Sequence, residues 1–185
     1  MTFRTISKAT VVTSAVACMI VGAFVAAYDW HEVRPHLSEI RAALDIFTPE
    51  DRNVPSDVAG FIWKLEEKHE INVNAQVAQM IVGKSLPMRA GAWHLHNLMW
   101  SLLLPLHFDR QTRMALYCHN IAYENGRGLS DAGEYYFHKP PHELSTSEVA
   151  GIIAIDWSPS INSPTRHQDH YAQATKRLLD TYATP

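Results

Sequence analysis

The chain has 185 residues, a length that suits one ordinary domain, and 46% of them are hydrophobic. Residues 9–28 carry no charge over 20 positions, and a helix of that length, at about 1.5 Å per residue, crosses the roughly 30 Å hydrocarbon layer of a bilayer. Without Arg4 and Lys8, the chain keeps 14 basic residues against 19 acidic ones, a net charge of −5 with histidine neutral. The apolar segment argues against a purely cytosolic protein, and the acidic body argues against a nucleic-acid binder.

The charges around the apolar segment predict its orientation. Arg4 and Lys8 precede it, and Asp29, Glu32 and Glu39 follow it. Because basic residues stay on the cytoplasmic side, we expect a single-pass protein of the inner (cytoplasmic) membrane. Its N-terminus would be cytoplasmic and its body periplasmic, or extracytoplasmic.

Whether the segment stays attached is a separate question. Its length exceeds the apolar core of a typical signal peptide, and Tyr28 and Trp30 stand where interfacial aromatic residues gather. Both features favour a membrane anchor. Residues 25–27 (Val-Ala-Ala) would also suit a signal peptidase, so a signal peptide is the alternative.

Beyond this segment the pattern predicts an all-α domain, because apolar residues recur at helical spacing and strand signals are nearly absent. We expect helices at residues 37–47, 55 to the charged stretch 66–69, 74–83, 90–106, 110–123, 130–137, 149–155 and 167–182.

Local signals fix several of these ends. Gly83 is a natural terminator of the 74–83 helix, and Asp109 is placed to cap the helix that follows it. Residues 126–128 (Gly-Arg-Gly) indicate a turn between helices. Ser145 and Glu148 have the spacing of a capping box before an apolar run, so they predict the start of the 149–155 helix.

Residues 90–106 form the most apolar stretch of the body, with Trp93, Trp100 and six leucines. A second membrane span is one interpretation. The stretch is short for a span and includes polar residues and Pro105, so we expect a central core helix instead.

Neither the cysteines nor the histidines define a reactive or metal-binding site. Cys18 lies in the apolar segment and Cys118 in the body, so no disulfide framework is expected, and Cys118 is predicted to be a buried core residue. His167 and His170 share a helix face, but no third ligand is in view. The sequence therefore predicts no metal site.

Residues 116–164 carry a resemblance to a known family. They contain counterparts, in the same order, of a seven-part pattern. Its parts are a Tyr-Leu-Asn segment, a glycine-containing turn, a helix ending Tyr-Phe-Gly-Lys, a Glu-Leu pair, a Ser or Thr cap, Glu-x-Ala and a proline-containing loop. The matching residues are Tyr117, Asn120, Ile121, Ala122, Gly126, Gly128, Ala132, Tyr136, Phe137, Lys139, Glu143, Leu144, Ser145, Glu148, Ala150, Pro159 and Pro164. Asn120 needs a shift of one residue. In this order the segment resembles the bacterial peptidoglycan glycosyltransferases, that is, the monofunctional transglycosylases and the glycosyltransferase domain of class A penicillin-binding proteins.

The resemblance extends towards the N-terminus. Residues 108–114 look like the start of the family's Ser/Thr-Lys-x-x-Ile-Leu helix, and residues 72–79 look like an altered copy of its Thr-Ile-Thr-Gln-Gln-Leu-Ala-Lys motif. The resemblance thus covers about residues 54–182. It implies a lysozyme-like helical domain behind one transmembrane helix. We expect an anchor or uncleaved signal at 1–29, a juxtamembrane helix and linker at 30–53, and a glycosyltransferase-like domain at 54–185.

The family joins lipid-linked disaccharides. A carboxylate deprotonates an acceptor hydroxyl, and basic residues with a divalent metal ion stabilise the departing diphosphate, so the resemblance allows a divalent metal as a cofactor of this chain. A base of this kind contributes about 10² to 10⁴ in rate. The family's first motif, Glu-Asp-x-x-Phe-x-x-His, corresponds to residues 55–69, where Glu66 or Glu67 is the counterpart of the catalytic carboxylate. The alternative is that both belong to a solvated, charged helix end.

Other parts of the family's site are altered. Its Arg-Lys-x-x-Glu motif falls on residues 93–97, so the two cations are missing and Asn97 replaces the carboxylate. An amide can neither act as a base nor carry charge, so Asn97 can only bind substrate. Together with Gln76 and Arg110 from the other matched motifs, it is a candidate substrate-binding residue by resemblance. The family's long loop over the donor site should lie between Glu67 and the segment from residue 72, where only a few residues remain.

Three functions follow from this pattern. The first is a degenerate glycosyltransferase-like domain of the cell envelope that meets lipid-linked disaccharide or glycan strands, with weakened or lost polymerising activity. The second is a non-catalytic scaffold or regulatory subunit that binds protein partners of an inner-membrane envelope complex. The third is a lysozyme-like peptidoglycan hydrolase with Glu66 as its acid.

Overall fold

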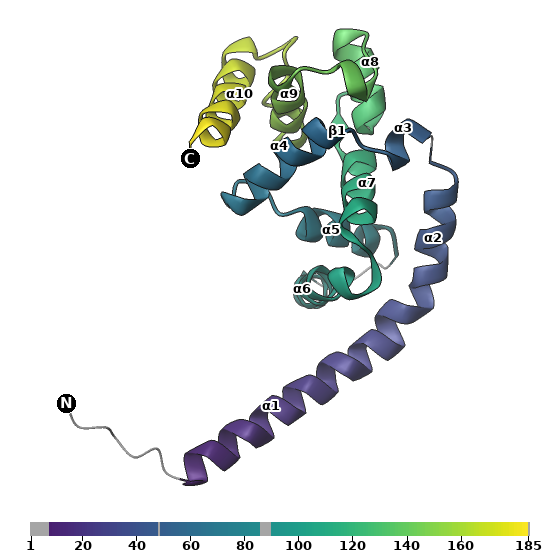
Figure 1. Cartoon of the computed structure of the whole chain (residues 1–185), viewed down its shortest axis with the longest axis vertical. Helices are drawn as coiled ribbons and strands as arrows, with labels where there is room; N and C mark the ends of the chain where they lie inside the picture. Colours follow the sequence, from purple (N-terminus) through teal and green to yellow (C-terminus); the bar gives the residue numbers. More distant parts are fainter. Residues whose placement is uncertain (1–7, 48, 86–89, 185) are drawn as a thin grey trace, which may run out of the picture. The chain divides into compact units, whose positions relative to one another are not determined.

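The structure is a computed structural model that describes residues 8–47, 49–85 and 90–184 (Figure 1). The chain divides into two compact units, one ending at Arg41 and the other beginning at Ala42. Each unit is described by itself.

The first unit is dominated by helix α1 (Lys8–Tyr28), whose side chains from Val11 onward are largely exposed. One helical stretch of the described residues, Val11–Asp45, is long and apolar enough to cross a membrane, with a mean hydropathy of 2.1 in its most apolar part. A π-helical segment (Asp29–Val33), a 3₁₀ turn (Arg34–His36) and helix α2 (Leu37–Asp45) continue the chain. Arg34 Nε donates to Asp29 Oδ2 at 2.8 Å.

The second unit is built from short helices, which confirms the all-α prediction. After α2 they are α3 (Pro49–Arg52), α4 (Ser56–Glu67), α5 (Val73–Ser85), α6 (Ala90–His107), α7 (Arg110–Asn120), α8 (Leu129–Phe137), a 3₁₀ turn (Pro141–Glu143), α9 (Thr146–Trp157) and α10 (Gln168–Ala183). The sheet found among the described residues is a hairpin of β1 (Ala122–Tyr123) and β2 (Gly126–Arg127).

Helix α9 is the centre of this unit. Its residues from Val149 to Ile155 are all buried, and it packs against α4, α8, α10 and β1. The predicted capping box is confirmed, because Ser145 Oγ accepts from the Glu148 N–H at 3.3 Å and Glu148 Oε2 accepts from the Ser145 N–H at 2.7 Å. Because α9 is capped at its start and buried on every side, its C-terminal end is held in a fixed place.

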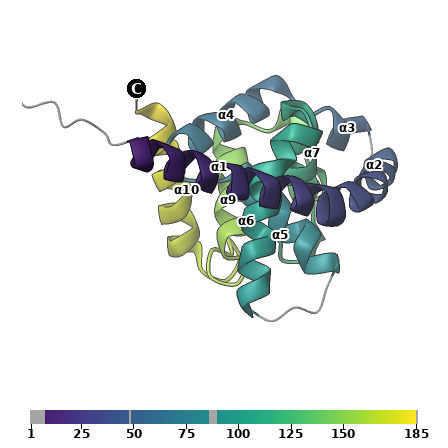
Figure 2. The same ribbon diagram turned by 90° about the horizontal axis from the view of Figure 1, so that it is seen from below.

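The prediction that residues 90–106 form the central core helix is wrong. Helix α6 packs against α5; it lies beside α5 in Figure 2, and Figure 1 shows it at the lower edge of this unit. Four of its side chains are buried, but four leucines are exposed. The buried residues are Met99, Trp100, Leu103 and Leu104, and the exposed ones are Leu95 (44%), Leu98 (56%), Leu102 (62%) and Leu106 (74%). Because the helix is apolar on several sides, its sequence does not reveal which side faces the core.

The predicted end of the third helix is also wrong, because α5 continues through Gly83 to Ser85. A glycine inside a helix costs only about 1 kcal/mol relative to alanine. Nothing lies within 4 Å of the position that a side chain on Gly83 would occupy, so neither packing nor backbone strain requires the helix to end there.

The predicted C-terminal ends of two other helices, α2 and α7, also differ from the structure. Helix α2 ends at Asp45 rather than at residue 47, and the ring of Phe47 stacks on His119 with centroids 3.8 Å apart. The pair Thr48-Pro49 is a stop signal for this helix in the sequence, and Thr48 lies outside the described residues. Helix α7 begins after the predicted cap, since Asp109 Oδ1 accepts from the Thr112 N–H at 2.7 Å, but it ends at Asn120.

The segment predicted to continue α7 and then turn is the β1–β2 hairpin, with Ala122 opposite Arg127 and Tyr123 opposite Gly126. Gly128 follows with φ of +118°, a conformation that L-residues with side chains rarely adopt. The turn of the hairpin is made by residues 124–125, so the predicted turn at residues 126–128 is wrong: Gly126 and Arg127 form β2, and Gly128 precedes α8.

Cys118 is buried in α7, which confirms its predicted place in the core. Burial raises the pKa of its thiol well above the ordinary value, so the reactive thiolate is suppressed.

Candidate functional site

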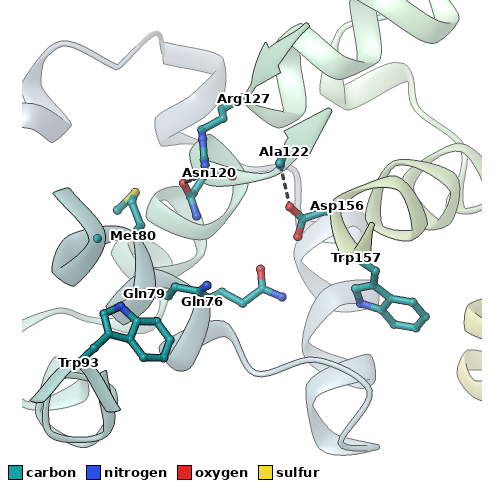
Figure 3. A pocket seen from close by; sticks show the side chains of 10 residues that line it. Gln76, Gln79, Met80, Trp93, Asn120, Ala122, Arg127, Asp156 and Trp157 are labelled. Carbon is teal, nitrogen blue, oxygen red and sulfur yellow. Dashed lines mark hydrogen bonds between the residues drawn. The ribbon is translucent and has the colours of Figure 1, made fainter. Parts of the chain in front are cut away.

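A pocket of about 680 Å³ opens between α5, the first turns of α6, the hairpin region and the end of α9 (Figure 3). Its lining residues are Gln76, Gln79, Met80, Gly83, Trp93, Asn120, Ala122, Arg127, Asp156 and Trp157. A volume of this size lies in the range of small-molecule sites, about 300–1,000 Å³.

Amides and tryptophans make up much of the pocket wall. Gln76 and Gln79 come from α5, Trp93 from α6 and Trp157 from the end of α9 (Figure 3). The Trp157 ring is supported from α10 by the Arg177 guanidinium group, 5.4 Å from its centroid. The pocket thus offers neutral hydrogen-bonding groups beside flat apolar surfaces.

Among the described residues that line the pocket, Asp156 is the one carboxylate and Arg127 is the one cation. The N–H of Ala122 donates to Asp156 Oδ1 at 2.7 Å, which ties the hairpin to the end of α9. Arg127 donates to Oδ1 of Asn120 at 2.6 Å. Because both groups are held by other partners, the pocket presents a negative and a positive group that do not form an ion pair with each other.

The surroundings of Asp156 alter its acidity. Burial raises the pKa of its carboxyl group to about 6, while the hydrogen bond from Ala122 and the charge of Arg127 act in the opposite direction. A carboxyl group with a pKa close to neutrality can both accept and return a proton at physiological pH.

Of the five residues expected from the sequence to form the site, Gln76 lines the pocket. Glu66 is half-buried at the end of α4, and its Oε1 accepts from the Val73 N–H at 3.0 Å, so it caps the start of α5. Glu67 is exposed. Neither carboxylate lines the pocket.

Arg110 and Asn97 occupy other positions. The Arg110 guanidinium group lies over the Trp63 ring, 4.3 Å from its centroid, on the α4–α7 side. Asn97 projects from α6, and its buried Oδ1 accepts no hydrogen bond from the residues that the structure describes. The structure thus does not gather these residues with Gln76 around the pocket.

The link between α4 and α5 is as short as the sequence indicated, since only residues 68–72 separate the two helices. His69 adopts a left-handed conformation with φ of +62°, and the Glu70 N–H donates to the Leu65 carbonyl oxygen. Glu70 also pairs with Arg177 of α10 at 2.7 Å. The link is therefore tied down at both sides.

The described residues do not fit a metal site of their own. No group of three or more His, Cys, Asp or Glu that could hold an ion occurs among them. His167 and His170 lie with ring centroids 6.1 Å apart. The pocket supplies one carboxylate, and one of its oxygens is already engaged by Ala122.

Sequence reasoning missed Asp156 and Arg127. Asp156 is the first charged residue after an unbroken apolar run from Val149 to Ile155, and a carboxyl group at the end of a fully buried helix is a signal that could have been used. Arg127 stands between two glycines, whose spacing indicates a turn and gives no sign of a pocket residue.

Sequence comparison places this helical domain in a known class. The family model described as Transglycosylase matches residues 72–183, more than half of the chain. The chain therefore belongs to the transglycosylase family, whose domain is lysozyme-like. It is also 31% identical over 86 residues to penicillin-binding protein 4 of Bacillus subtilis (strain 168), a match that covers 46% of this chain and 14% of that protein. The matched family region begins at Asn72, after Glu66 and Glu67.

Proposed function

We propose that the chain is a membrane-anchored, peptidoglycan glycosyltransferase-like domain. It binds glycan strands in the pocket described above, which is called the α5–α9 pocket from here on, and it polymerises lipid-linked disaccharides slowly or not at all. The family match supports the glycan substrate. The weakened activity is supported above all by one observation: the carboxylates aligned with the family's base, Glu66 and Glu67, do not line the pocket.

The pocket wall suits a sugar. Side-chain amides such as Gln76 and Asn120 both donate and accept hydrogen bonds, which matches hydroxyl and acetamido groups. The rings of Trp93 and Trp157 offer flat apolar surfaces for the C–H faces of pyranose rings. Neutral polar groups beside aromatic rings are better suited to a neutral glycan than to a highly charged ligand.

The pocket is poor in the charges that polymerisation needs. A departing diphosphate is stabilised by cations aimed at its oxygens, and Arg127 is the one cation among the described lining residues. Trp93 and His94 stand where the resemblance places an Arg-Lys pair, and Asn97 stands in place of its carboxylate. These replacements would slow any reaction that expels a diphosphate.

Two features support a function at a membrane. Helix α1 is long and apolar, and the flanking charges favour a cytoplasmic N-terminus with the body outside the inner membrane. The exposed leucines of α6, which include Leu98 and Leu102, form an apolar face of the kind that meets lipid or another protein. A bilayer is the partner that both features share.

The proposal is tested with the purified full chain in lipid nanodiscs. We expect a polymerisation rate on lipid-linked disaccharide far below that of a family member that keeps the Glu-Asp and Arg-Lys motifs, together with retained binding to isolated glycan strands. Polymerisation at an ordinary enzymatic rate would contradict the weakened activity. Absence of both turnover and glycan binding would overturn the proposal and favour a scaffold of an envelope complex.

The same preparation addresses the hydrolase alternative. Digestion of purified peptidoglycan that is lost on Glu66→Gln substitution would favour a lysozyme-like enzyme that uses Glu66. In the structure Glu66 caps α5, so the melting temperature of this variant must be compared with that of the unmodified chain.

A further inference from the structure

We propose that Asp156 is the pocket's proton acceptor, the residue that takes the proton from the attacking hydroxyl group of a bound sugar during any glycosyl transfer this chain performs. This assignment rests on the proposed function, because it needs a glycan in the α5–α9 pocket. It gives Asp156 the part that the sequence alone suggested for Glu66 or Glu67.

The position of Asp156 is the first support. It lies in the last turn of α9, behind a run of buried side chains that fixes the helix, and Ala122 holds its Oδ1. Within the described part of the chain, its Oδ2 accepts no hydrogen bond. Figure 3 shows the Asp156 carboxyl group pointing into the space where the side-chain amide of Gln76 also lies. One oxygen is therefore anchored, and the other is free for a ligand.

The contrast with Glu66 is the second support. Glu66 uses Oε1 to cap the N-terminus of α5, where it satisfies one of the backbone N–H groups that have no partner within the helix. Glu66 does not line the pocket, whereas Asp156 does, so the carboxyl group of Asp156 is the one that a ligand in the pocket can meet.

Arg127 provides the complementary charge. Its Nη1 atom donates to Asn120 Oδ1 at 2.6 Å, which holds the guanidinium group in the pocket without an ion pair to Asp156. A carboxylate neutralised by direct contact with a cation would be a poorer base. The pocket therefore keeps a base and a cation apart, as transfer from an anionic leaving group requires.

The step conserves protons and electrons. Asp156 Oδ2 takes the proton from the acceptor hydroxyl group while that oxygen forms a bond to the donor's anomeric carbon. The bond between this carbon and the diphosphate oxygen breaks, and its electron pair leaves with the diphosphate, near Arg127. Asp156 then releases the proton to water. The co-reactants are a lipid-diphosphate-linked saccharide and a glycan hydroxyl group.

The acidity of Asp156 suits this task. Burial raises the pKa of its carboxyl group to about 6, so most molecules carry the ionised base at neutral pH. The groups that face it electrostatically are Arg127 from β2 and Tyr117 and Cys118 from α7. Burial raises the pKa of both Tyr117 and Cys118, so neither is charged in the range where Asp156 titrates.

The test measures release of lipid diphosphate from fluorescent lipid-linked disaccharide by the full chain in nanodiscs. Asp156→Asn should lower turnover by about 10² or more while the melting temperature and glycan binding stay unchanged, because the amide oxygen can still accept from Ala122. Asp169→Asn, an exposed carboxylate at the start of α10, is the matched control and should keep full turnover.

Two further measurements keep the assignment testable if Asp156→Asn folds poorly. Asp156→Glu retains the carboxyl group and should restore part of the turnover. The turnover of the unmodified chain should rise with pH through about 6, and that rise should be absent in any folded variant without the carboxyl group.

The outcomes separate this inference from the proposed function. Turnover that survives Asp156→Asn but is lost on Glu66→Gln would overturn the assignment. Intact glycan binding with no turnover by the unmodified chain would also overturn it, while the proposed function stands in its non-catalytic form. Loss of glycan binding in the unmodified chain would overturn both.

Discussion

Tyr171 of α10 stands over Gly151 of α9 so closely that a methyl group on Gly151 would overlap the tyrosine hydroxyl group. Both residues lie in the interface that joins the last helix to the central one. The glycine therefore sets how near α10 can approach α9, and α9 in turn carries Asp156 and Trp157 to the pocket.

This contact predicts that Gly151→Ala lowers the free energy of unfolding by about 1–3 kcal/mol, the usual cost of adding volume to a packed interior. Urea unfolding measures the change. Gly60→Ala in α4 is the control, because nothing lies within 4 Å of the added methyl group there, and it should be neutral or stabilising by up to about 1 kcal/mol. In a Tyr171→Phe background the cost of Gly151→Ala should shrink. An equal cost in both backgrounds would show that the hydroxyl group is not the obstacle.

The start of α9 predicts a dependence of stability on pH. Hydrogen bonds from Lys139 and from the backbone and side chain of Ser145 lower the pKa of Glu148 to about 2. The unfolded chain has the ordinary value of about 4.3. Because the folded-state pKa is the lower one, the stabilisation is complete above about pH 4.3 and is lost as the pH falls through about 2.

The test compares Glu148→Gln with the unmodified chain by urea unfolding from pH 7 down to pH 2. At pH 7 the substitution should cost about 1 kcal/mol, the typical value of a helix cap, and the difference should shrink steadily below about pH 4.3 towards pH 2. Glu134→Gln, whose side chain is 71% exposed, should show no such trend. A cost that stays constant over the whole range would exclude the ionised carboxylate as its cause.

The sequence predicted those parts of the fold that depend on neighbouring residues. Asp109 and Ser145 cap the helices that follow them because a cap is made within four residues. The choice of central helix could not be made this way. Residues 90–106 and 149–155 are both apolar, and which of them is surrounded depends on the packing of helices distant in sequence.

The pocket residues also show that contacts between residues distant in sequence could not be predicted. Gln76 was found because the family motif carries it, but Asp156 meets Ala122 across 34 residues of chain. That contact and the hairpin that supplies it are products of the tertiary structure. A lone aspartate after an apolar run is visible in the sequence, whereas the raised pKa of its carboxyl group depends on the burial that only the fold creates.

The exposed leucines of α6 predict contact with the bilayer. In a Cys18→Ser background, Leu102→Cys can be labelled with a fluorophore that responds to polarity, since Cys118 is buried. In nanodiscs the label should report an apolar environment and be quenched by nitroxide-bearing lipids. Lys176→Cys on α10, at a side chain that is 74% exposed, should report water. Equal signals from both positions would count against a membrane-facing α6.

The tryptophans of the pocket predict how a glycan is held. Trp157 lines the pocket at the end of α9, with Arg177 against its ring, so Trp157→Ala removes a flat apolar surface without removing a charge. We expect glycan affinity to fall about tenfold, or roughly 1.4 kcal/mol, as measured by binding to isolated strands. Trp30→Ala is the matched control, because this tryptophan is 63% exposed and does not line the pocket. Undiminished affinity in Trp157→Ala, with normal affinity in the control, would place the glycan elsewhere. A loss in both variants would indicate that tryptophan removal acts through stability, which the melting temperatures would reveal.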